Sequence, residues 1–355
     1  MLLFPTVAML PVALSLGYTF TPDYVEQVTD PRIPVLYDAG ASQTLPYSEA
    51  PVSGSSMYSF ATTSTGKQYF LAMTVFASAA GAGYGANILD LDTLERHSFT
   101  NATAFTNQEH EAFDFARPGY RFTANALDNL GMVLFSDFGE VVINITVWPT
   151  SRVLYYGGTG AFTYVNETLR SWALPACRMS GTISFLSPTS SSSATKSIAI
   201  NAEKSVTWYD RLWGRLGLRN GTSFFFALYL SSASSDLVIS GYCIDSVDPP
   251  ATTRFSNVRL RSETTVAITP IDIFEPSTSD VWTSPRTGRT YPQKWTLGVQ
   301  GRGMLRIRSV RGDQEDYGEG VAGAAYSGFV DFAGVFDGRA VTGFGVVGLR
   351  AVIPG

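Results

Sequence analysis

The segment Ser223-Phe224-Phe225-Phe226-Ala227-Leu228-Tyr229-Leu230 is apolar at almost every position. Successive side chains of a β-strand point to opposite faces of the sheet, so a strand with this sequence presents apolar side chains on both faces. Both faces must then be covered. The segment is therefore either sandwiched between two domains or lines a filled cavity.

Other segments alternate between apolar and polar residues, namely residues 143–147, 258–261 and 305–308. This alternation is typical of half-buried antiparallel strands, with apolar side chains pointing inward and charged ones outward. Asp337-Gly338 lies between two apolar runs and predicts a β-hairpin. Aromatic residues make up 13% of the chain and there are 33 glycines, which favours an all-β protein rich in turns.

The length of 355 residues allows two domains, each with its own core. The stretch Val247-Asp248-Pro249-Pro250-Ala251 predicts a linker, because two consecutive prolines cannot continue the hydrogen-bond ladder of a sheet. We therefore predict two antiparallel β-barrels or sandwiches in tandem, over residues 18–248 and 252–355.

Residues 1–17 carry no charge and are mostly apolar, with small residues at the positions expected before a cleavage site. The run is shorter than a membrane span needs. It predicts a signal peptide, hence a secreted or vesicular protein with no stable membrane span once the leader is removed; the alternative is a buried N-terminal strand. Four sequons predict glycosylation at Asn101, Asn144, Asn166 and Asn220.

The chain has two cysteines, Cys177 and Cys243. In an oxidising compartment they would form one disulfide, whereas in the cytosol they would be two buried thiols. The sequence leaves both alternatives open.

Several function classes are disfavoured. The net charge is -5 and no basic stripe occurs, which argues against a nucleic-acid partner. The chain lacks Gly-x-Ser-x-Gly, His-Glu-x-x-His and paired Cys-x-x-Cys motifs, and His97 and His110 lie in a polar stretch that predicts surface or loop positions. The glycine-rich residues 81–85 lack the spacing and the following helix of a phosphate loop. No metal and no nucleotide cofactor is therefore predicted.

The segment Trp208-Tyr209-Asp210-Arg211-Leu212-Trp213-Gly214 carries an acid amid much aromatic surface. In a strand, Trp208 and Asp210 share one face, and Tyr209 and Arg211 share the other. If the first face lines a cavity, the pKa of Asp210 should rise and the carboxyl could transfer a proton or polarise a carbonyl. The alternative is that Asp210 forms a structural ion pair with Arg211 or another arginine.

A second aromatic segment, Ser55-Ser56-Met57-Tyr58-Ser59-Phe60, precedes a strongly apolar strand. Ser56 and Tyr58 fall on one face and could offer their hydroxyls to a ligand. The alternative is the edge of a sheet with solvated hydroxyls.

Three further stretches accompany the aromatic cluster: Ser171-Trp172-Ala173-Leu174-Pro175-Ala176-Cys177 before it, and Gly318-Glu319-Gly320 and Phe344-Gly345-Val346-Val347 after it. Together with residues 204–214 they resemble the fungal lipocalin-like superfamily that includes carotenoid hydratases, kievitone hydratase and Diels–Alderases. The resemblance covers most of the chain after about Ser53. It implies two lipocalin-like β-domains, a ligand pocket in or beside the first of them, no cofactor and a large apolar substrate.

Members of this superfamily either add water across an alkene or promote a [4+2] cycloaddition. Many carry a Trp-rich segment with an acid where this chain has Ser56-Met57-Tyr58-Ser59-Phe60, which disfavours hydration here. Orientation of two reacting groups alone can lower a barrier by roughly 7–11 kcal/mol at the favourable extreme. The sequence therefore predicts a Diels–Alderase of polyketide or polyketide–amino acid metabolism, with a hydro-lyase or a secreted ligand-binding protein as alternatives.

For this activity, the residues predicted to be catalytic are Asp210 and Tyr209, and those predicted to line the substrate pocket are Trp208, Trp213, Tyr58, Ser56 and Phe226.

Overall fold

The computed structural model describes residues 17–22, 35–44, 52–78, 81–104, 114–186, 196–232, 235–260, 265–318 and 324–352. The predicted signal peptide up to residue 16, His110 and residues 319–320 lie outside these ranges. The described part of the chain is almost entirely β-structure, which confirms the predicted fold class. No helix in it has the length and apolar character needed to cross a membrane.

The first sheet is curled and has 13 strands in the described residues. Ten of them are hydrogen-bonded to their neighbours in the order β4-β3-β2-β1-β13-β11-β8-β7-β6-β5. The other three, β9, β10 and β12, pair with β11. Its strands are β1 (Val52–Thr62), β2 (Gln68–Ser78), β3 (Gly81–Asp90), β4 (Arg96–Thr103), β5 (Asp114–Arg117), β6 (Tyr120–Ala124), β7 (Met132–Asp137), β8 (Val141–Pro149), β9 (Leu154–Tyr155), β10 (Ala161–Tyr164), β11 (Glu167–Phe185), β12 (Lys196–Ala199) and β13 (Val206–Gly214). Short 3-10 turns are η1 (Ala41–Thr44), η2 (Tyr156–Gly158) and η3 (Ala202–Lys204).

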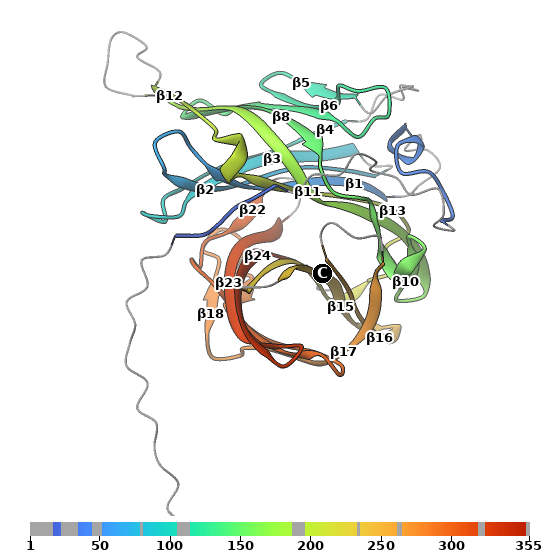
Figure 1. The fold of residues 1–355 in the computed structure, drawn as a ribbon. Helices are drawn as coiled ribbons and strands as arrows, with labels where there is room; N and C mark the ends of the chain where they lie inside the picture. Colours follow the sequence, from blue (N-terminus) through green and yellow to red (C-terminus); the bar gives the residue numbers. More distant parts are fainter. Residues whose placement is uncertain are drawn as a thin grey trace, which may run out of the picture.

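The second sheet closes into a barrel of eight strands, because β21 pairs with β23 as well as with β20. The eight barrel strands are β14 (Asn220–Ser232), β15 (Ser235–Asp248), β16 (Pro250–Leu260), β17 (Ala267–Pro276), β20 (Lys294–Val299), β21 (Gly303–Ser309), β23 (Ala324–Phe336) and β24 (Arg339–Val352). A ninth strand of the same sheet, β22 (Glu315–Tyr317), pairs with β23. A small separate hairpin consists of β18 (Val281–Thr283) and β19 (Thr290–Pro292). Figure 1 looks into the barrel, with the curled sheet lying across one side of it.

Three hydrophobic clusters follow from this arrangement: one on the concave side of the first sheet, one between the two sheets and one inside the barrel. Strand β14 contributes side chains both to the cluster between the sheets and to the cluster inside the barrel. Phe224 and Phe226 point into the barrel, while Ala227 and Tyr229 pack between the sheets. Burial on both faces explains the apolar segment 223–230, and it selects the sandwiched alternative together with a filled barrel interior.

In the alternating segments the apolar side chains are more buried than the polar ones, as predicted, with one exception. Ile143 and Ile145 are buried while Asn144 is exposed, and Leu305 and Ile307 are buried between exposed arginines. The predicted hairpin is present, since Asp337 and Gly338 connect β23 to β24 with the positive φ angles of 50° and 74° that a tight hairpin turn requires.

The exception is Arg259, which was predicted to point into solvent and is 2% exposed. It points out of the barrel, but the first sheet covers that side. Its guanidinium donates to the carbonyl oxygens of Val153 and Arg152 at 3.0 and 2.8 Å. Alternation identified the face correctly but not what covers it.

The predicted linker at residues 247–251 is instead the turn of a hairpin, in which Val247 pairs with Pro250 and β15 continues into β16. The chain passes from the first sheet to the second between Gly214 and Asn220. Residues 220–248, predicted to belong to the first domain, are therefore strands of the barrel. The two prolines are accommodated because they lie at the end of a strand pair, where ladder hydrogen bonds are not needed.

The disulfide that the sequence left open as one alternative is not formed, since Cys177 and Cys243 are both free and buried. They lie in different clusters: Cys177 on the concave side of the first sheet and Cys243 inside the barrel. Of the two alternatives, the structure has the buried thiols. Burial raises the pKa of both thiols, which keeps them in the unreactive protonated form.

The predicted glycosylation sites have different exposures. Asn101, Asn144 and Asn166 are exposed, whereas Asn220 is partly buried at the start of β14. Glycosylation itself stays a prediction.

Thiol labelling tests the placement of the cysteines. Without reductant, a thiol-specific reagent should label neither Cys177 nor Cys243 in the native protein, because both are buried. After unfolding in denaturant it should label both. Mass spectrometry of the labelled protein would read this out, and an unfolded protein with no reactive thiol would instead indicate the disulfide.

Candidate active site

Strand pairing brings together four of the residues predicted from the sequence. β1 and β13 are adjacent and antiparallel, so that Ser56 lies opposite Asp210 and Tyr58 lies opposite Trp208. Tyr58 and Trp208 belong to the hydrophobic cluster between the two sheets. The face that carries Asp210 is therefore the one that meets the barrel.

Asp210 is 4% exposed and is held by two neutral donors. The hydroxyl of Tyr156 donates to its Oδ2 at 2.7 Å, and Trp208 Nε1 donates to the same oxygen at 3.4 Å. In the described part of the chain the carboxyl has no ion-pair partner.

Arg211 does not fill that role, because it lies on the opposite face of β13. It donates to Ser53 Oγ and to the carbonyl oxygens of Gly54, Leu212 and Ser42. Among the described residues, the structural ion pair that the sequence left open as an alternative is therefore not formed.

This environment sets the protonation of Asp210. Burial raises the pKa of the carboxyl to about 7, although the hydrogen bonds from Tyr156 and Trp208 lower it in part. An acid with such a pKa both donates and accepts a proton near neutral pH, which is the property that general acid–base catalysis needs. Asp210 is thus a buried acid in an aromatic environment.

Tyr156 was missed in the sequence, and the barrel positions it. It begins the 3-10 turn η2, whose Gly157 N–H donates to Asn257 Oδ1 at 3.0 Å on strand β16 of the barrel. Arg259 of the same strand holds the carbonyl oxygens just before this turn. The local signal was a tyrosine followed by two glycines. Neither the contact of Tyr156 with Asp210, 54 residues away in the sequence, nor the contact with the barrel could be inferred from it.

Further aromatic rings surround Tyr156. Tyr242 of β15 lies 5.6 Å from it, and Phe225 of β14 lies 5.4 Å from Tyr242, measured between ring centroids. Phe162 packs on both Tyr156 and Tyr242. Phe162 and Phe225 are partly exposed, so these rings connect the buried carboxyl to the surface.

The structure does not bring Phe226 to this site. It lies inside the barrel, where its ring packs against Phe224 and Phe274. Its neighbour Phe225 faces the site and lies 6.2 Å from Tyr58. In a strand that is apolar on both faces, the sequence gives no basis for choosing between adjacent phenylalanines.

Tyr209 and Trp213 are also separated from Asp210, because both point to the concave side of the first sheet. The Tyr209 hydroxyl lies 2.8 Å from Gln43 Oε1 and 3.2 Å from Ser55 Oγ. Trp213 packs edge-on against Tyr37. Tyr209 and Asp210 are neighbours along one strand and so lie on its opposite faces, and the structure does not bring these two predicted catalytic residues together.

Metal binding has no support in the described ranges, where no three His, Cys, Asp or Glu side chains gather closely enough to hold an ion.

No protein-family model matches the chain. Kievitone hydratase of Fusarium solani subsp. phaseoli is 28% identical over 334 residues, which cover 93% of this chain and 90% of that protein. The crystal structure of kievitone hydratase from Nectria haematococca has a TM-score of 0.84 at 25% identity and matches 95% of this chain and 99% of its own. In sequence and in fold the chain is therefore similar to kievitone hydratase, as the resemblance noted in the sequence implied.

Two other proteins are also similar to this chain. Dehydratase asqC of Emericella nidulans is 29% identical over 351 residues, 95% of each chain. The crystal structure of CghA has a TM-score of 0.55 at 12% identity, over 96% of this chain and 98% of that one. At this identity the likeness to CghA shows the fold alone. The two relatives matched in sequence carry the names of enzymes.

The protonation of Asp210 predicts a pH dependence of stability. The native carboxyl keeps its proton up to about pH 7, whereas the unfolded one loses it near its ordinary pKa of 3.8. The free energy of unfolding should therefore fall as the pH rises from about 4 to about 7, by roughly 4 kcal/mol from this group.

Urea unfolding of the wild type and Asp210→Asn at both ends of this range would measure the effect. The variant should gain stability over the wild type as the pH rises, whereas Asp114→Asn, which changes an exposed carboxyl, should not. A constant difference between wild type and Asp210→Asn would show that folding does not shift the pKa of Asp210.

Proposed function

We propose that this protein is a hydro-lyase that acts on a large apolar substrate. It adds water across a carbon–carbon double bond, or forms such a double bond by removing water. Asp210 is the proton donor and acceptor. The observation that carries the proposal is the buried carboxyl with a pKa of about 7, held in the described part of the chain by Tyr156 and Trp208. The names of the two sequence relatives, a hydratase and a dehydratase, support it.

In the direction of hydration, protonated Asp210 transfers its proton to one carbon of the alkene. Water then adds to the neighbouring cationic carbon and gives a proton to the Asp210 carboxylate, which restores the acid. Dehydration is the reverse: Asp210 protonates the leaving hydroxyl, water departs, and the carboxylate removes a proton from the adjacent carbon. Both directions begin with Asp210 protonated.

Tyr156 supports the step in which Asp210 is ionised. Its hydroxyl donates to Oδ2 at 2.7 Å, so that the negative charge left after proton transfer is stabilised by a charge-assisted hydrogen bond. The aromatic rings of Trp208, Tyr58 and Tyr242 form apolar surroundings suited to a cationic intermediate and an apolar substrate.

Cycloaddition remains the alternative that the sequence predicted. A shaped pocket with a hydroxyl near a carbonyl would serve it, and Ser56 and Tyr58 stand beside Asp210 and Trp208. However, a cycloaddition moves no proton, so it does not require a carboxyl that exchanges its proton near neutral pH. The site therefore favours the hydro-lyase.

Removal of the acid tests the proposal. Asp210→Asn should lower turnover by about 10²- to 10⁴-fold, the usual contribution of a general acid or base. The assay follows oxygen-18 from labelled water into the alcohol, or its loss from the alcohol, with alkenes and alcohols of apolar polyketides and terpenoids. Tyr209→Phe is the matched control, since it removes a hydroxyl from the opposite face of the same strand.

Uptake of labelled oxygen that is unchanged in Asp210→Asn would remove Asp210 from the mechanism. Cyclisation of a linear polyene without exchange of oxygen, at equal rates in the wild type and the variant, would instead favour the cycloaddition.

Tyr156→Phe tests the hydrogen bond separately. The Tyr156 hydroxyl lowers the pKa of Asp210, so its removal should raise that pKa. Because both directions need protonated Asp210, the turnover of the wild type should fall as the pH rises through about 7, and in the variant this fall should move to higher pH. A pH–rate profile that does not move would mean that Tyr156 does not tune the acid.

A further inference from the structure

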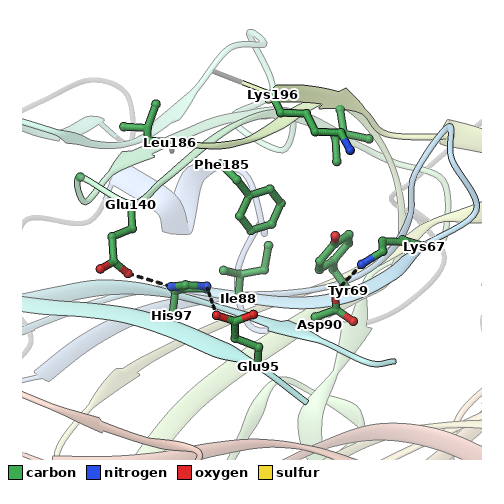
Figure 2. A pocket seen from close by; sticks show the side chains of 12 residues that line it. Lys67, Tyr69, Ile88, Asp90, Glu95, His97, Glu140, Phe185, Leu186 and Lys196 are labelled. Carbon is green, nitrogen blue, oxygen red and sulfur yellow. Dashed lines mark hydrogen bonds and ion pairs between the residues drawn. The ribbon is translucent and has the colours of Figure 1, made fainter. Parts of the chain in front are cut away.

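A cavity of about 790 Å³ opens at one end of the first sheet. Its lining comes from β2, β3, β4, β11 and β12 and from the turn between β7 and β8. Figure 2 shows the side chains that surround it. The volume lies within the range of about 300–1,000 Å³ that is typical of pockets for small molecules.

This cavity is separate from the site of Asp210. Its residue Tyr69 belongs to the hydrophobic cluster on the concave side of the first sheet, whereas the next residue, Phe70, belongs to the cluster between the sheets. The sheet itself therefore divides the two sites.

The floor of the cavity is apolar and aromatic. Ile88 and Tyr69 are buried members of the concave cluster, and the Phe185 ring lies 5.8 Å from Tyr69 between centroids. Ile198 completes this floor on strand β12. The surface suits an alkyl chain or another apolar body.

The charges on the rim are unequally paired. Asp90 holds Lys67 at 3.1 Å, and His97 lies 2.9 Å from Glu140 and 3.5 Å from Glu95. Asp90 thus has Lys67 as its partner, whereas Glu95 and Glu140 share the single imidazole of His97. The side chain of Lys196 has no hydrogen bond or ion pair within the described ranges, and Figure 2 shows it across the Phe185 ring from Glu140.

From this arrangement we propose that the cavity is a second ligand site, which binds an amphipathic carboxylic acid. The apolar body of the acid lies on Tyr69, Ile88 and Phe185, and its carboxylate pairs with Lys196. A cationic head group would have to compete with Lys67 and His97 for the rim carboxylates, whereas the ammonium group of Lys196 has no acidic partner in the described ranges. Binding here does not depend on the activity proposed for Asp210.

Binding of three probes with the same alkyl chain tests the site: dodecanoate, dodecan-1-ol and dodecylammonium. Calorimetric titration of the full chain should give an affinity for dodecanoate about three- to fivefold above that for the alcohol, as one exposed ion pair provides. Dodecylammonium should bind more weakly than the alcohol. The preference for the acid should shrink at high salt, because Lys196 is exposed.

Two substitutions separate the parts of the site. Lys196→Met should abolish the preference for dodecanoate and leave the affinity for dodecan-1-ol unchanged. Phe185→Ala should weaken the binding of all three probes. Lys204→Met, which removes another exposed lysine outside the cavity, is the matched control and should change nothing.

Equal affinities of the wild type for the three probes would overturn the proposal, as would a preference for the acid that survives Lys196→Met. The effect of Asp210→Asn on turnover is independent of these results, so that failure of one proposal can be told from failure of the other.

Discussion

The burial of one carboxyl between two β-sheets is the constraint on which the site depends. Taking an acid out of water disfavours its charged form unless a cation or several strong donors compensate. Here the compensation is partial, because Asp210 receives hydrogen bonds from Tyr156 and Trp208 but has no cationic partner in the described chain. An arginine in place of these donors would hold the acid permanently ionised, and an entirely apolar environment would hold it permanently protonated. Two neutral donors leave it between these states.

The two sheets have to be assembled for this environment to exist. The first sheet contributes Asp210, Trp208 and the strand with Tyr58, but the rings that cover them from the other side, including Tyr242 and Phe225, come from the barrel. The barrel also orients the donor, since Asn257 binds the turn that carries Tyr156. Neither sheet alone would keep Asp210 out of water. The apolar face of β14 therefore serves both folding and the chemistry of the site.

Much of the local geometry could be predicted from the sequence, because alternation along a strand is a strict rule. It placed Trp208 with Asp210, placed Tyr209 with Arg211, and paired Ser56 with Tyr58. It could not state which of two strand faces meets the other sheet, and this is why Phe226 was chosen in place of Phe225. Pro249 and Pro250 suggested a linker because proline interrupts a ladder, but a hairpin turn tolerates it equally well. Tyr156 depends on contacts between segments far apart in the chain, which no local pattern records.

The central claim is that Asp210 changes its protonation near neutral pH in the folded protein. The most direct measurement is a pH titration by nuclear magnetic resonance of protein labelled with carbon-13 at the aspartate carboxyls, with Asp210→Asn used to assign the signal. The account predicts that the signal missing from the variant titrates in the wild type with a midpoint near pH 7. A midpoint near 4, the ordinary value for aspartate, would contradict it.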